Sequence, residues 1–382
     1  MMTEQVPGDV NLDEERQQEA REYARIRRRW MLGEIVFTLA LLLVFWLSGL
    51  SVWLRDALIA WGLTSPWTLT AAYVGILIVA STLIFLPINY WTGFVLPHRY
   101  GLSTQTVGGW LADQGKVLGL ELILGIPIVQ VIYGLLRTQP DTWWIWGAAL
   151  MLAITLIFGA LSPVVLVPLF YKLKPLEDEA LVERVQNLAE KTGTRVAQVN
   201  TIDLSSRTTA ANAMVMGLGS TKRIALGDTL YEEYSIDEIE AVLAHELAHQ
   251  VHHDLELGIA LNVVTTVAGF YLAHVTLRWG VEQFGFEGIA DLAAIPLVIL
   301  VATLASLLIM PLVNAFSRWR ERMADRYALE VIDNPEAFAN AMTRLSNQNL
   351  AEVDPPRWVV WLLYDHPPIR ERLELVRRQQ TA

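Results

Sequence analysis

The sequence predicts a mainly α membrane protein, in which a bundle of about six spanning helices carries a smaller α+β domain on one face. The 382 residues are 53 % hydrophobic and only 18 % charged, and the mean hydropathy is +0.35. A soluble globule cannot bury that much apolar surface. Long uncharged runs also recur along the chain, each near the roughly twenty residues that a helix needs to cross the hydrocarbon layer.

The six expected spans follow the uncharged runs in chain order. They are residues 35–54, 67–96, 117–136, a segment within 142–171, 257–277 and 292–317. The "GLTSP" stretch separates the first span from the second, and Glu121 interrupts the third. Because a carboxylate inside a span is costly, Glu121 is expected to line a water-filled chamber or to lie near the interface.

The distribution of basic residues predicts the orientation of these spans. Fourteen Lys and Arg residues precede the first span or lie in the loops after the second, fourth and sixth, whereas the alternate loops hold one each, at Arg55, Arg137 and Arg278. Since basic loops stay in the cytoplasm, we expect a multi-pass membrane protein (of the cell membrane, if prokaryotic) with both termini and residues 170–256 in the cytoplasm.

The chain therefore divides into five expected regions. These are an N-terminal cytoplasmic tail (1–30), spans one to four (31–169), a cytoplasmic segment (170–256), a membrane hairpin of spans five and six (257–317) and a C-terminal cytoplasmic segment (318–382). Periodic apolar residues predict a helix over 177–191, and residues 196–202 and 222–226 are typical of short strands. The hairpin forces its two flanking segments onto one membrane face, where they are expected to form a single domain.

Charge and cysteine content exclude several functions. The net charge of −11 argues against binding of nucleic acid, which requires a basic face. The chain has no cysteine, so disulfides, thiolate metal sites and cysteine nucleophiles are excluded.

The stretch "LAHELAHQVHHD" (243–254) holds four of the seven histidines. Ser235 and Glu238 form a capping-box pattern that predicts the start of a helix. Residues four apart share a helix face, so His245 and His249 can bind one ion, and Glu246 lies beside them. This is the H-E-x-x-H pattern, in which two imidazoles bind zinc and the glutamate acts as general base. The alternative is a pair of solvated surface histidines.

A catalytic zinc needs a third protein ligand and one open position for water. Glu321 and Asp325 lie four apart after the sixth span, so they share a helix face on the expected cytoplasmic side. They could serve as a ligand and as an acceptor for an imidazole N–H. The alternative is that both carboxylates simply pair with the neighbouring arginines. His98 is another possible ligand, although it lies in a loop between early spans.

These motifs resemble those of the type I CAAX prenyl endopeptidases, with the HtpX-type proteases as more distant relatives. The resemblance extends from about residue 98 to residue 370, in family order, whereas residues 1–90 show little that matches. It is carried by "HRYGLSTQT" (98–106), "PVVLVPLFYKLKPL" (163–176), "NAMVMG" (212–217), "KRIALGDTLY" (222–231), "SRWRERMAD" (317–325) and "HPP" (366–368).

The resemblance implies a zincin-like catalytic domain and a chamber walled by the spans. It implies that Glu321 is the third zinc ligand, Asp325 its neighbour that orients a histidine, and His366 the group that stabilises the oxyanion. It also implies an edge strand that binds substrate through Asn212, Ala213, Met214 and Gly217. Six predicted spans differ from the seven of eukaryotic members, and Asp365 stands where Ser or Thr is usual before the histidine.

The expected function is therefore that of a membrane zinc metalloendopeptidase with one zinc ion per chain and Glu246 as general base. Its expected partners are the lipid bilayer and a membrane-associated or lipidated (CAAX-type) peptide or protein, and no nucleic acid. One alternative is an HtpX-like protease that removes misfolded membrane proteins. A second is a non-catalytic membrane protein with a structural metal site, which would require four protein ligands.

Overall fold

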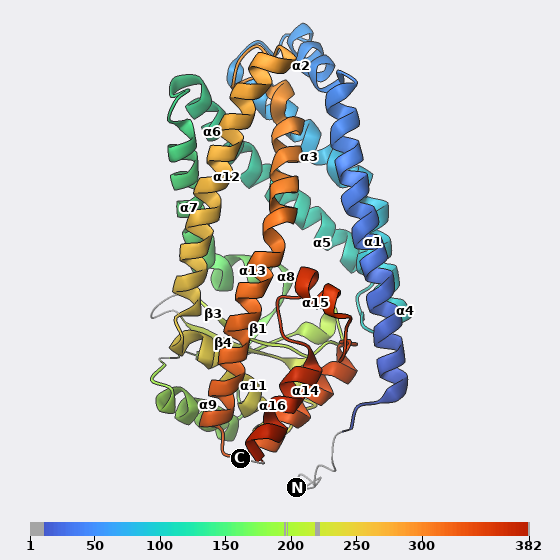
Figure 1. The fold of residues 1–382 in the computed structure, drawn as a ribbon, viewed down its shortest axis with the longest axis vertical. Coiled ribbons are helices and arrows are strands. Elements are labelled where there is room, and N and C mark those ends of the chain that lie inside the picture. Colours follow the sequence, from blue (N-terminus) through green and yellow to red (C-terminus); the bar gives the residue numbers. More distant parts are fainter. Residues whose placement is uncertain (1–10, 195, 197, 218–221, 381–382) are drawn as a thin grey trace.

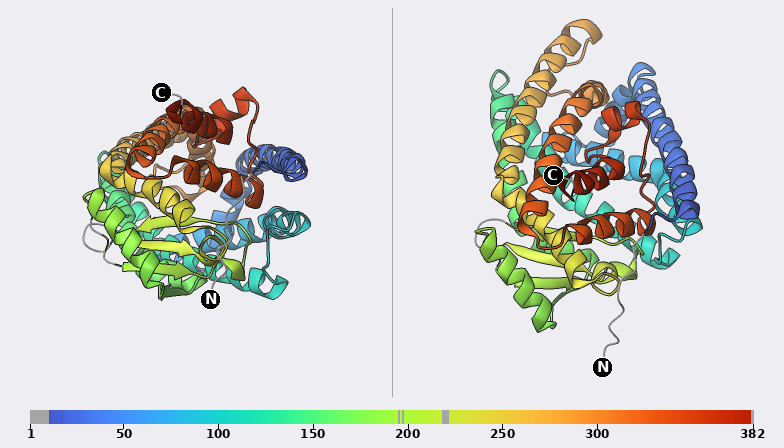
Figure 2. Two further views of the ribbon diagram at one scale, coloured as in Figure 1. Left: turned by 90° about the horizontal axis from the view of Figure 1, so that it is seen from below. Right: turned by 60° about the horizontal axis from the view of Figure 1, so that its bottom comes forward.

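The computed structural model describes residues 11–194, 196, 198–217 and 222–380. The described helices form a long bundle, and a small sheet with its covering helices lies at one end of it (Figure 1). The first and last described segments of the chain, the start of α1 and α16, lie at that same end. Figure 2 shows that, at this end, the sheet lies on one side of the molecule and the first helix on the other.

In the described part of the chain, six helical stretches are long and apolar enough to cross a membrane, as predicted. They are Glu14–Leu47, Pro66–Arg99, Val107–Thr138, Trp143–Phe170, Asp254–Phe284 and Leu292–Val331. Their elements are α1 (Glu14–Leu47), α3 (Pro66–Tyr90), η1 (Trp91–Val95), α4 (Leu96–Arg99), α5 (Val107–Leu120), η2 (Glu121–Gly125), α6 (Ile126–Thr138), α7 (Trp143–Leu161), η3 (Ser162–Leu166), α8 (Val167–Phe170), α12 (Asp254–Phe284), η6 (Leu292–Ala294) and α13 (Ile295–Val331).

The boundary expected between the N-terminal tail and the first span is not observed, because α1 runs without a break from Glu14 to Leu47. Residues 1–10 lie outside the described part. Asp13 caps α1 by accepting hydrogen bonds from the amides of Glu15 and Arg16. The first turns of the helix then pack against the C-terminal segment, and Gln17 donates to the hydroxyl of Ser346. The sequence pattern of this stretch is polar because its partner is a polar protein surface and not lipid.

The predicted end of the first span, residue 54, is also wrong. Gly49 has φ +79°, a left-handed conformation that glycine adopts without strain. The chain turns there, so α1 ends at Leu47 and a separate short helix, α2 (Leu50–Ala60), follows. At 11 residues, α2 is too short to cross a membrane.

Three spans contain a wide π-helical turn, and a proline follows each turn in the second position of the next helix. These prolines are Pro97 after η1, Pro127 after η2 and Pro168 after η3. Proline has no N–H and clashes with the carbonyl four residues earlier, which explains the local widening. Glu121 begins η2 and is exposed.

The sheet has four strands in the order β1-β2-β4-β3. β2 pairs in parallel with β4, whereas β1 with β2 and β3 with β4 are antiparallel. β3 therefore lies at an edge. The strands are β1 (Leu173–Pro175), β2 (Gln198–Ile202), β3 (Ala213–Met216) and β4 (Arg223–Gly227).

One hydrophobic core joins the two cytoplasmic segments predicted from the hairpin. It combines Leu181 and Leu188 of the first segment with Ala328, Phe338 and Val376 of the second. The sixth span and the second segment are continuous, because α13 runs without a break to Val331, so the predicted boundary at 318 lies within a helix. The helices of this domain are α9 (Glu179–Lys191), α10 (Asp228–Tyr231), α11 (Ile236–Val251), α14 (Pro335–Gln348), α15 (Arg357–Leu363) and α16 (Ile369–Gln380).

Candidate active site

The central helix of the site is α11, which carries the histidine motif. It begins with the predicted capping box, in which Ser235 and Glu238 each accept a hydrogen bond from the other's backbone amide. Ala241, Ala244 and Ala248 are fully buried. Small side chains at these positions let neighbouring elements approach closely, and α13 and α14 both pack on this helix. The motif is therefore held in a rigid environment.

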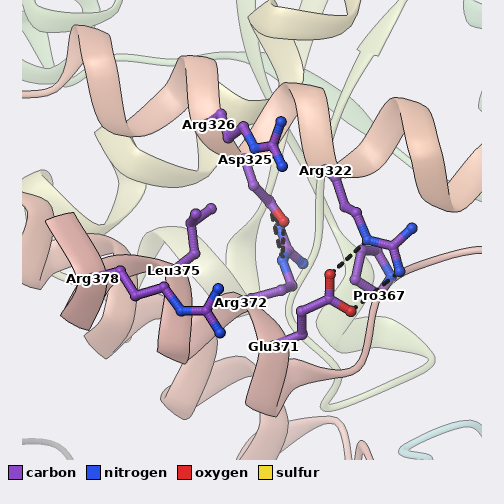
Figure 3. Close-up of a pocket in the computed structure, with 8 residues that line it drawn as sticks. All are labelled: Arg322, Asp325, Arg326, Pro367, Glu371, Arg372, Leu375 and Arg378. Carbon is purple, nitrogen blue, oxygen red and sulfur yellow. Dashed lines mark hydrogen bonds and ion pairs between the residues drawn. The ribbon is translucent and has the colours of Figure 1, made fainter. Parts of the chain in front are cut away.

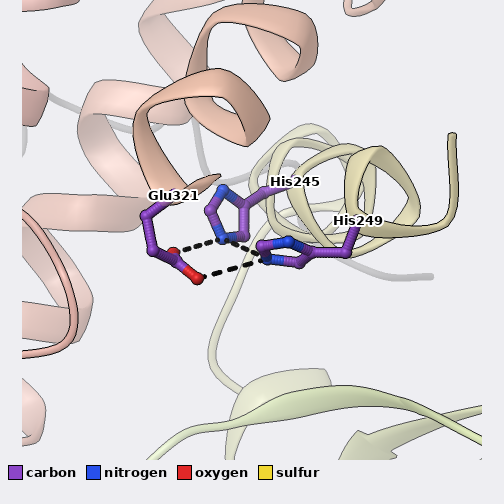
Figure 4. A group of neighbouring side chains, drawn as sticks. All are labelled: His245, His249 and Glu321. Atoms are coloured by element: carbon purple, nitrogen blue, oxygen red, sulfur yellow. Dashed lines mark hydrogen bonds and ion pairs between the residues drawn. The ribbon is translucent and has the colours of Figure 1, made fainter. Parts of the chain in front are cut away.

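Two imidazoles and one carboxylate converge between α11 and α13 (Figure 4). The Nε2 atoms of His245 and His249 are 3.3 Å apart. Nε2 of His245 lies 3.2 Å from Oε2 of Glu321, and Nε2 of His249 lies 3.5 Å from Oε1. Zinc–ligand bonds of about 2.0–2.2 Å in a tetrahedron place ligand atoms about 3.3–3.6 Å apart. The three side chains thus have the spacing that a tetrahedral ion requires.

The other nitrogen of each imidazole faces a carboxylate. Nδ1 of His245 lies 2.9 Å from Asp325, and Nδ1 of His249 lies 2.7 Å from Asp254. Since a carboxylate only accepts, each Nδ1 carries the proton and donates it. In the neutral form of each imidazole the lone pair of Nε2 is then free and points into the cluster, which is the tautomer that a metal ligand needs.

An arginine holds each of these carboxylates in turn. Nε of Arg372, on α16, donates to Asp325 at 3.0 Å, and Arg320, on α13, donates to Asp254 and to the carbonyl of His252. Figure 3 shows Arg372 reaching Asp325 beside a small cavity of about 90 Å³. We refer to Asp325–Arg372 and Asp254–Arg320 as the two braces of the site.

Asp325 was predicted from the sequence, whereas Asp254, Arg320 and Arg372 were not. Asp254 is five residues after His249, which does not put it on the same helix face. His253 adopts a left-handed conformation with φ +55°, so the chain reverses and Asp254 returns to the imidazole. The sequence offered only a weak signal for this contact, namely that Asp254 is the last residue of the histidine-rich stretch.

The site fits a divalent metal for a second reason. Oε2 of Glu321 is buried and has no hydrogen-bond partner, although two imidazole nitrogens lie within 3.3 Å of it. A buried carboxylate oxygen without a partner is costly. A zinc ion among these atoms would satisfy it, and His–His–carboxylate is a ligand set typical of catalytic zinc.

The surroundings shift the pKa values of two groups on α11. Burial by itself lowers the pKa of His245, but the carboxylates of Asp325 and Glu321 outweigh it and raise that pKa to about 9. Burial raises the pKa of Glu246, against the opposing effect of the two imidazoles. A carboxylate with a raised pKa takes up a proton more readily, as a general base must.

His366 reaches the same cluster from the C-terminal segment. Its Nε2 lies 3.3 Å from Oε2 of Glu321, and its Nδ1 lies 2.8 Å from Asp365. The hydrogen bond to Asp365 raises the pKa of His366, which favours its protonated, hydrogen-bond-donating form. The guanidinium of Arg318 donates to the carbonyls of Val360 and Tyr364 at the end of α15, so it fixes the loop that carries the histidine.

The residues expected to bind substrate lie along the edge of the sheet. Ala213 and Met214 belong to β3, Asn212 precedes it, and Gly217 ends it with φ +90°. The carbonyl of Asn212 accepts from the amide of Gly227 in the neighbouring strand. His98 is not part of the metal cluster, because its ring nitrogens lie 2.7 and 2.9 Å from the carbonyls of Phe94 and Gln105.

Comparison with known proteins places these features in a family. The model of the CAAX prenyl protease N-terminal region, described as five membrane helices, matches residues 2–172. The model of peptidase family M48 matches residues 175–380, which include the whole metal cluster. The chain belongs to peptidase family M48. Of the described helices, four in the N-terminal match are long enough to span, and α2 is not.

Individual M48 relatives are similar to this chain over most of its length. It is 32 % identical to an uncharacterized metalloprotease, YhfN, of Bacillus subtilis over 82 % of this chain and 74 % of that protein. It is 28 % identical to CAAX prenyl protease 1 of Saccharomyces cerevisiae over 95 % of this chain and 86 % of that protein. The crystal structure of S. mikatae Ste24p superposes with a TM-score of 0.86 at 26 % identity, covering 98 % of this chain and 92 % of that one.

The family membership confirms the main functional prediction. The chain is a multi-pass membrane metalloendopeptidase of family M48, and its substrate is a peptide or protein. The quality-control alternative is not favoured, because the family model and several relatives are of the CAAX prenyl protease type. The non-catalytic alternative is not supported either, since the family is one of peptidases.

Proposed function

We propose that this M48 enzyme hydrolyses membrane-associated or lipidated peptides of the CAAX type at a zinc centre formed by His245, His249 and Glu321. The observation that carries the proposal is the convergence of two free Nε2 atoms and an unpartnered carboxylate oxygen at tetrahedral spacing. Bound there, zinc supplies Lewis acidity, which acidifies a water and polarises the scissile carbonyl.

The side chains around the cluster perform the other steps of catalysis. Glu246 takes the proton from the attacking water and delivers it to the leaving amine. Protonated His366 donates a hydrogen bond to the oxyanion that develops on the carbonyl. Asp325, with its arginine, keeps His245 in the tautomer that binds the metal. The raised pKa of Glu246 and of His366 supports these two assignments.

The substrate is proposed to bind by adding a strand to β3. In an antiparallel ladder, alternate residues direct both backbone groups to the same side. The backbone of Asn212 bonds to β4. The backbone N–H and C=O groups of Ala213 and Val215 therefore point to the free edge of the sheet. An extended peptide paired there would lie along the sheet beside α11, and main-chain hydrogen bonds would give affinity with little dependence on sequence.

A substitution at Glu246 tests the catalytic proposal. Glu246→Gln should keep one zinc ion per chain and lower peptide cleavage by about a hundredfold or more, because general-base catalysis contributes roughly 10²–10⁴. Zinc is measured by metal analysis and cleavage with a fluorescent prenylated peptide. Glu256→Gln is the matched control, since Glu256 is 63 % exposed at its side chain and should retain full activity. Undiminished turnover by Glu246→Gln would refute the role.

The lipid part of the proposal has its own test. A peptide with a prenylated cysteine should be cleaved faster than the same peptide without the lipid, by the wild-type enzyme in detergent or vesicles. Equal cleavage of both peptides, or a preference for an unfolded membrane protein, would reject the CAAX-type substrate while leaving the peptidase assignment intact.

We also propose that the catalytic domain and both termini face the cytoplasm, with the five sequence regions in the predicted order. Basic residues concentrate on that face. Because the chain has no cysteine, single cysteines report the orientation directly. A cysteine in place of exposed Trp61, beyond α2, should react with an impermeant thiol reagent in intact cells, and one in place of Glu256 should not. The reverse pattern would overturn the orientation.

A further inference from the structure

Two cavities meet on the α1 side of the active site. The first, about 920 Å³ in volume, is bounded by α1 and by the loop that carries His366; we call it the His366 cavity. The second, about 650 Å³, extends to Thr208 and Ala210, just before the edge strand; we call it the β3 cavity. Five residues line both cavities: Tyr23, Arg27, Gly93, Pro97 and Asn349.

Where these cavities begin, Asn349 occupies the hydrogen-bonding groups at the free edge of the sheet. Its side chain accepts from the amide of Ala211 at 2.8 Å and donates to the carbonyl of the same residue at 3.0 Å. A substrate strand on β3 can therefore pair no further than Ala213 in this direction. Its next residues must leave the sheet and enter the space that Asn349 lines.

The direction of the substrate follows from the direction of β3. The strand runs from Ala213 to Met216, so an antiparallel substrate ends its pairing at Ala213 with its C-terminal side. Antiparallel pairing is also slightly the more stable per residue. The residues that follow the scissile bond thus pass Asn349 and approach the junction of the two cavities.

Arg27 is the cation at this junction. It is exposed, and its guanidinium lies 5.7 Å from the ring centroid of Tyr23. Among the described residues no carboxylate pairs with Arg27, whereas its neighbour Arg28 is bonded to Glu352 at 2.8 Å. The other carboxylates of the His366 cavity are occupied or distant: Asp365 is bonded to His366, and Glu34 is two helix turns, about 10.5 Å, along α1.

We propose that Arg27, which lines both cavities, is the residue that binds the free C-terminal carboxylate of the peptide substrate. A guanidinium stays charged at all relevant pH values and matches a carboxylate with two parallel hydrogen bonds. The inference rests on the proposed function, because it takes the peptide along β3 and the scissile bond at Glu246.

The test compares peptides that differ only in the carboxylate. Fluorescent peptides with a prenylated cysteine fourth from the end are prepared as the free acid and as the amide. The wild-type enzyme should favour the acid by about tenfold or more in kcat/KM, as expected for a charge-assisted hydrogen-bonded pair. In Arg27→Gln this ratio should fall to about 1, and in Arg27→Lys it should be intermediate. Arg25→Gln, an exposed cation on the same helix, should keep the wild-type ratio.

A binding measurement separates this inference from the catalytic proposal. In the Glu246→Gln background the acid should bind about tenfold more tightly than the amide, and adding Arg27→Gln should remove the difference. Equal affinity for acid and amide, an unchanged ratio in Arg27→Gln, or an equal loss in Arg25→Gln overturns the role of Arg27. Failure of the proposed function gives a different result, in which no variant cleaves either peptide. Zinc content and the midpoint of thermal unfolding show that each variant is folded.

Discussion

Two buried clusters of charge lie at opposite ends of this protein, and they differ in one respect. At the end of the bundle away from the sheet, Arg55 of α2 donates to Asp291 at 2.6 Å, to Asp56 at 2.9 Å and to Glu287 at 3.1 Å. Asp291 also accepts from the backbone amides of Ala293 and Glu287. No buried polar atom of these four side chains lacks a partner. The far cluster therefore closes the hairpin between α12 and α13 and offers no unsatisfied atom to a ligand.

The metal cluster has the same kind of arginine–aspartate pairs but remains incomplete. Its two braces satisfy Nδ1 of each histidine. Both Nε2 atoms and Oε2 of Glu321, however, converge on one point, and Oε2 has no hydrogen-bond partner. Buried charge alone therefore does not mark a binding site. The metal site is distinguished by a set of ligand atoms that the protein holds in place but does not fully hydrogen-bond.

Removing a brace should have the largest effect on metal affinity. Asp325→Asn and Asp254→Asn should each weaken zinc binding by about 10–100-fold, since partners of liganding histidines typically contribute that much. Asp325 should have the larger effect, because its side chain is 2 % exposed and that of Asp254 13 %. Competition with a fluorescent chelator measures the affinity. Asp333→Asn is the control, because the side chain of Asp333 is 86 % exposed. If either brace variant bound zinc as tightly as this control, the assignment of the braces would be contradicted.

An effect of up to about tenfold on affinity is expected from each unit of pH. The metal requires neutral imidazoles, and in the metal-free protein the pKa of His245 is raised to about 9. Below that pH a proton must leave when zinc binds, so the apparent affinity should rise by about tenfold per pH unit between pH 7 and 9 and level off above. Calorimetry in buffers of different ionisation enthalpy should detect the released proton at pH 7. An affinity independent of pH over this range would argue against the raised pKa.

The far cluster should leave zinc affinity unchanged while affecting stability. Asp291→Asn removes the buried partner of Arg55 and should lower the free energy of unfolding by about 3 kcal/mol, seen as a lower midpoint of thermal unfolding in detergent. The zinc affinity of the folded protein should equal that of the wild type. A change in zinc affinity would show that the two ends are coupled, and would contradict a purely structural role of the far cluster.

The sequence was sufficient for features that depend on local spacing. The six spans follow from uncharged runs, and the positions of His245, Glu246 and His249 follow from helical periodicity and a capping box. The pairing of Glu321 with them needed a hairpin that returns the chain to the same face, and the sequence contained that as well. Errors occurred where a single residue changed the chain direction, as at Gly49, or where a polar helix found a protein partner, as at Gln17.

By itself, then, the sequence determined which helices enter the membrane and which side chains can bind a metal, because both depend on residues a few positions apart. The tertiary structure alone decided that Asp254, Arg320 and Arg372 join the predicted Asp325 in orienting those ligands. Arg320 is 66 residues from Asp254, and Arg372 is 127 residues from His245. Contacts across such separations depend on how whole helices pack, and on one left-handed residue, His253, that no periodicity reveals.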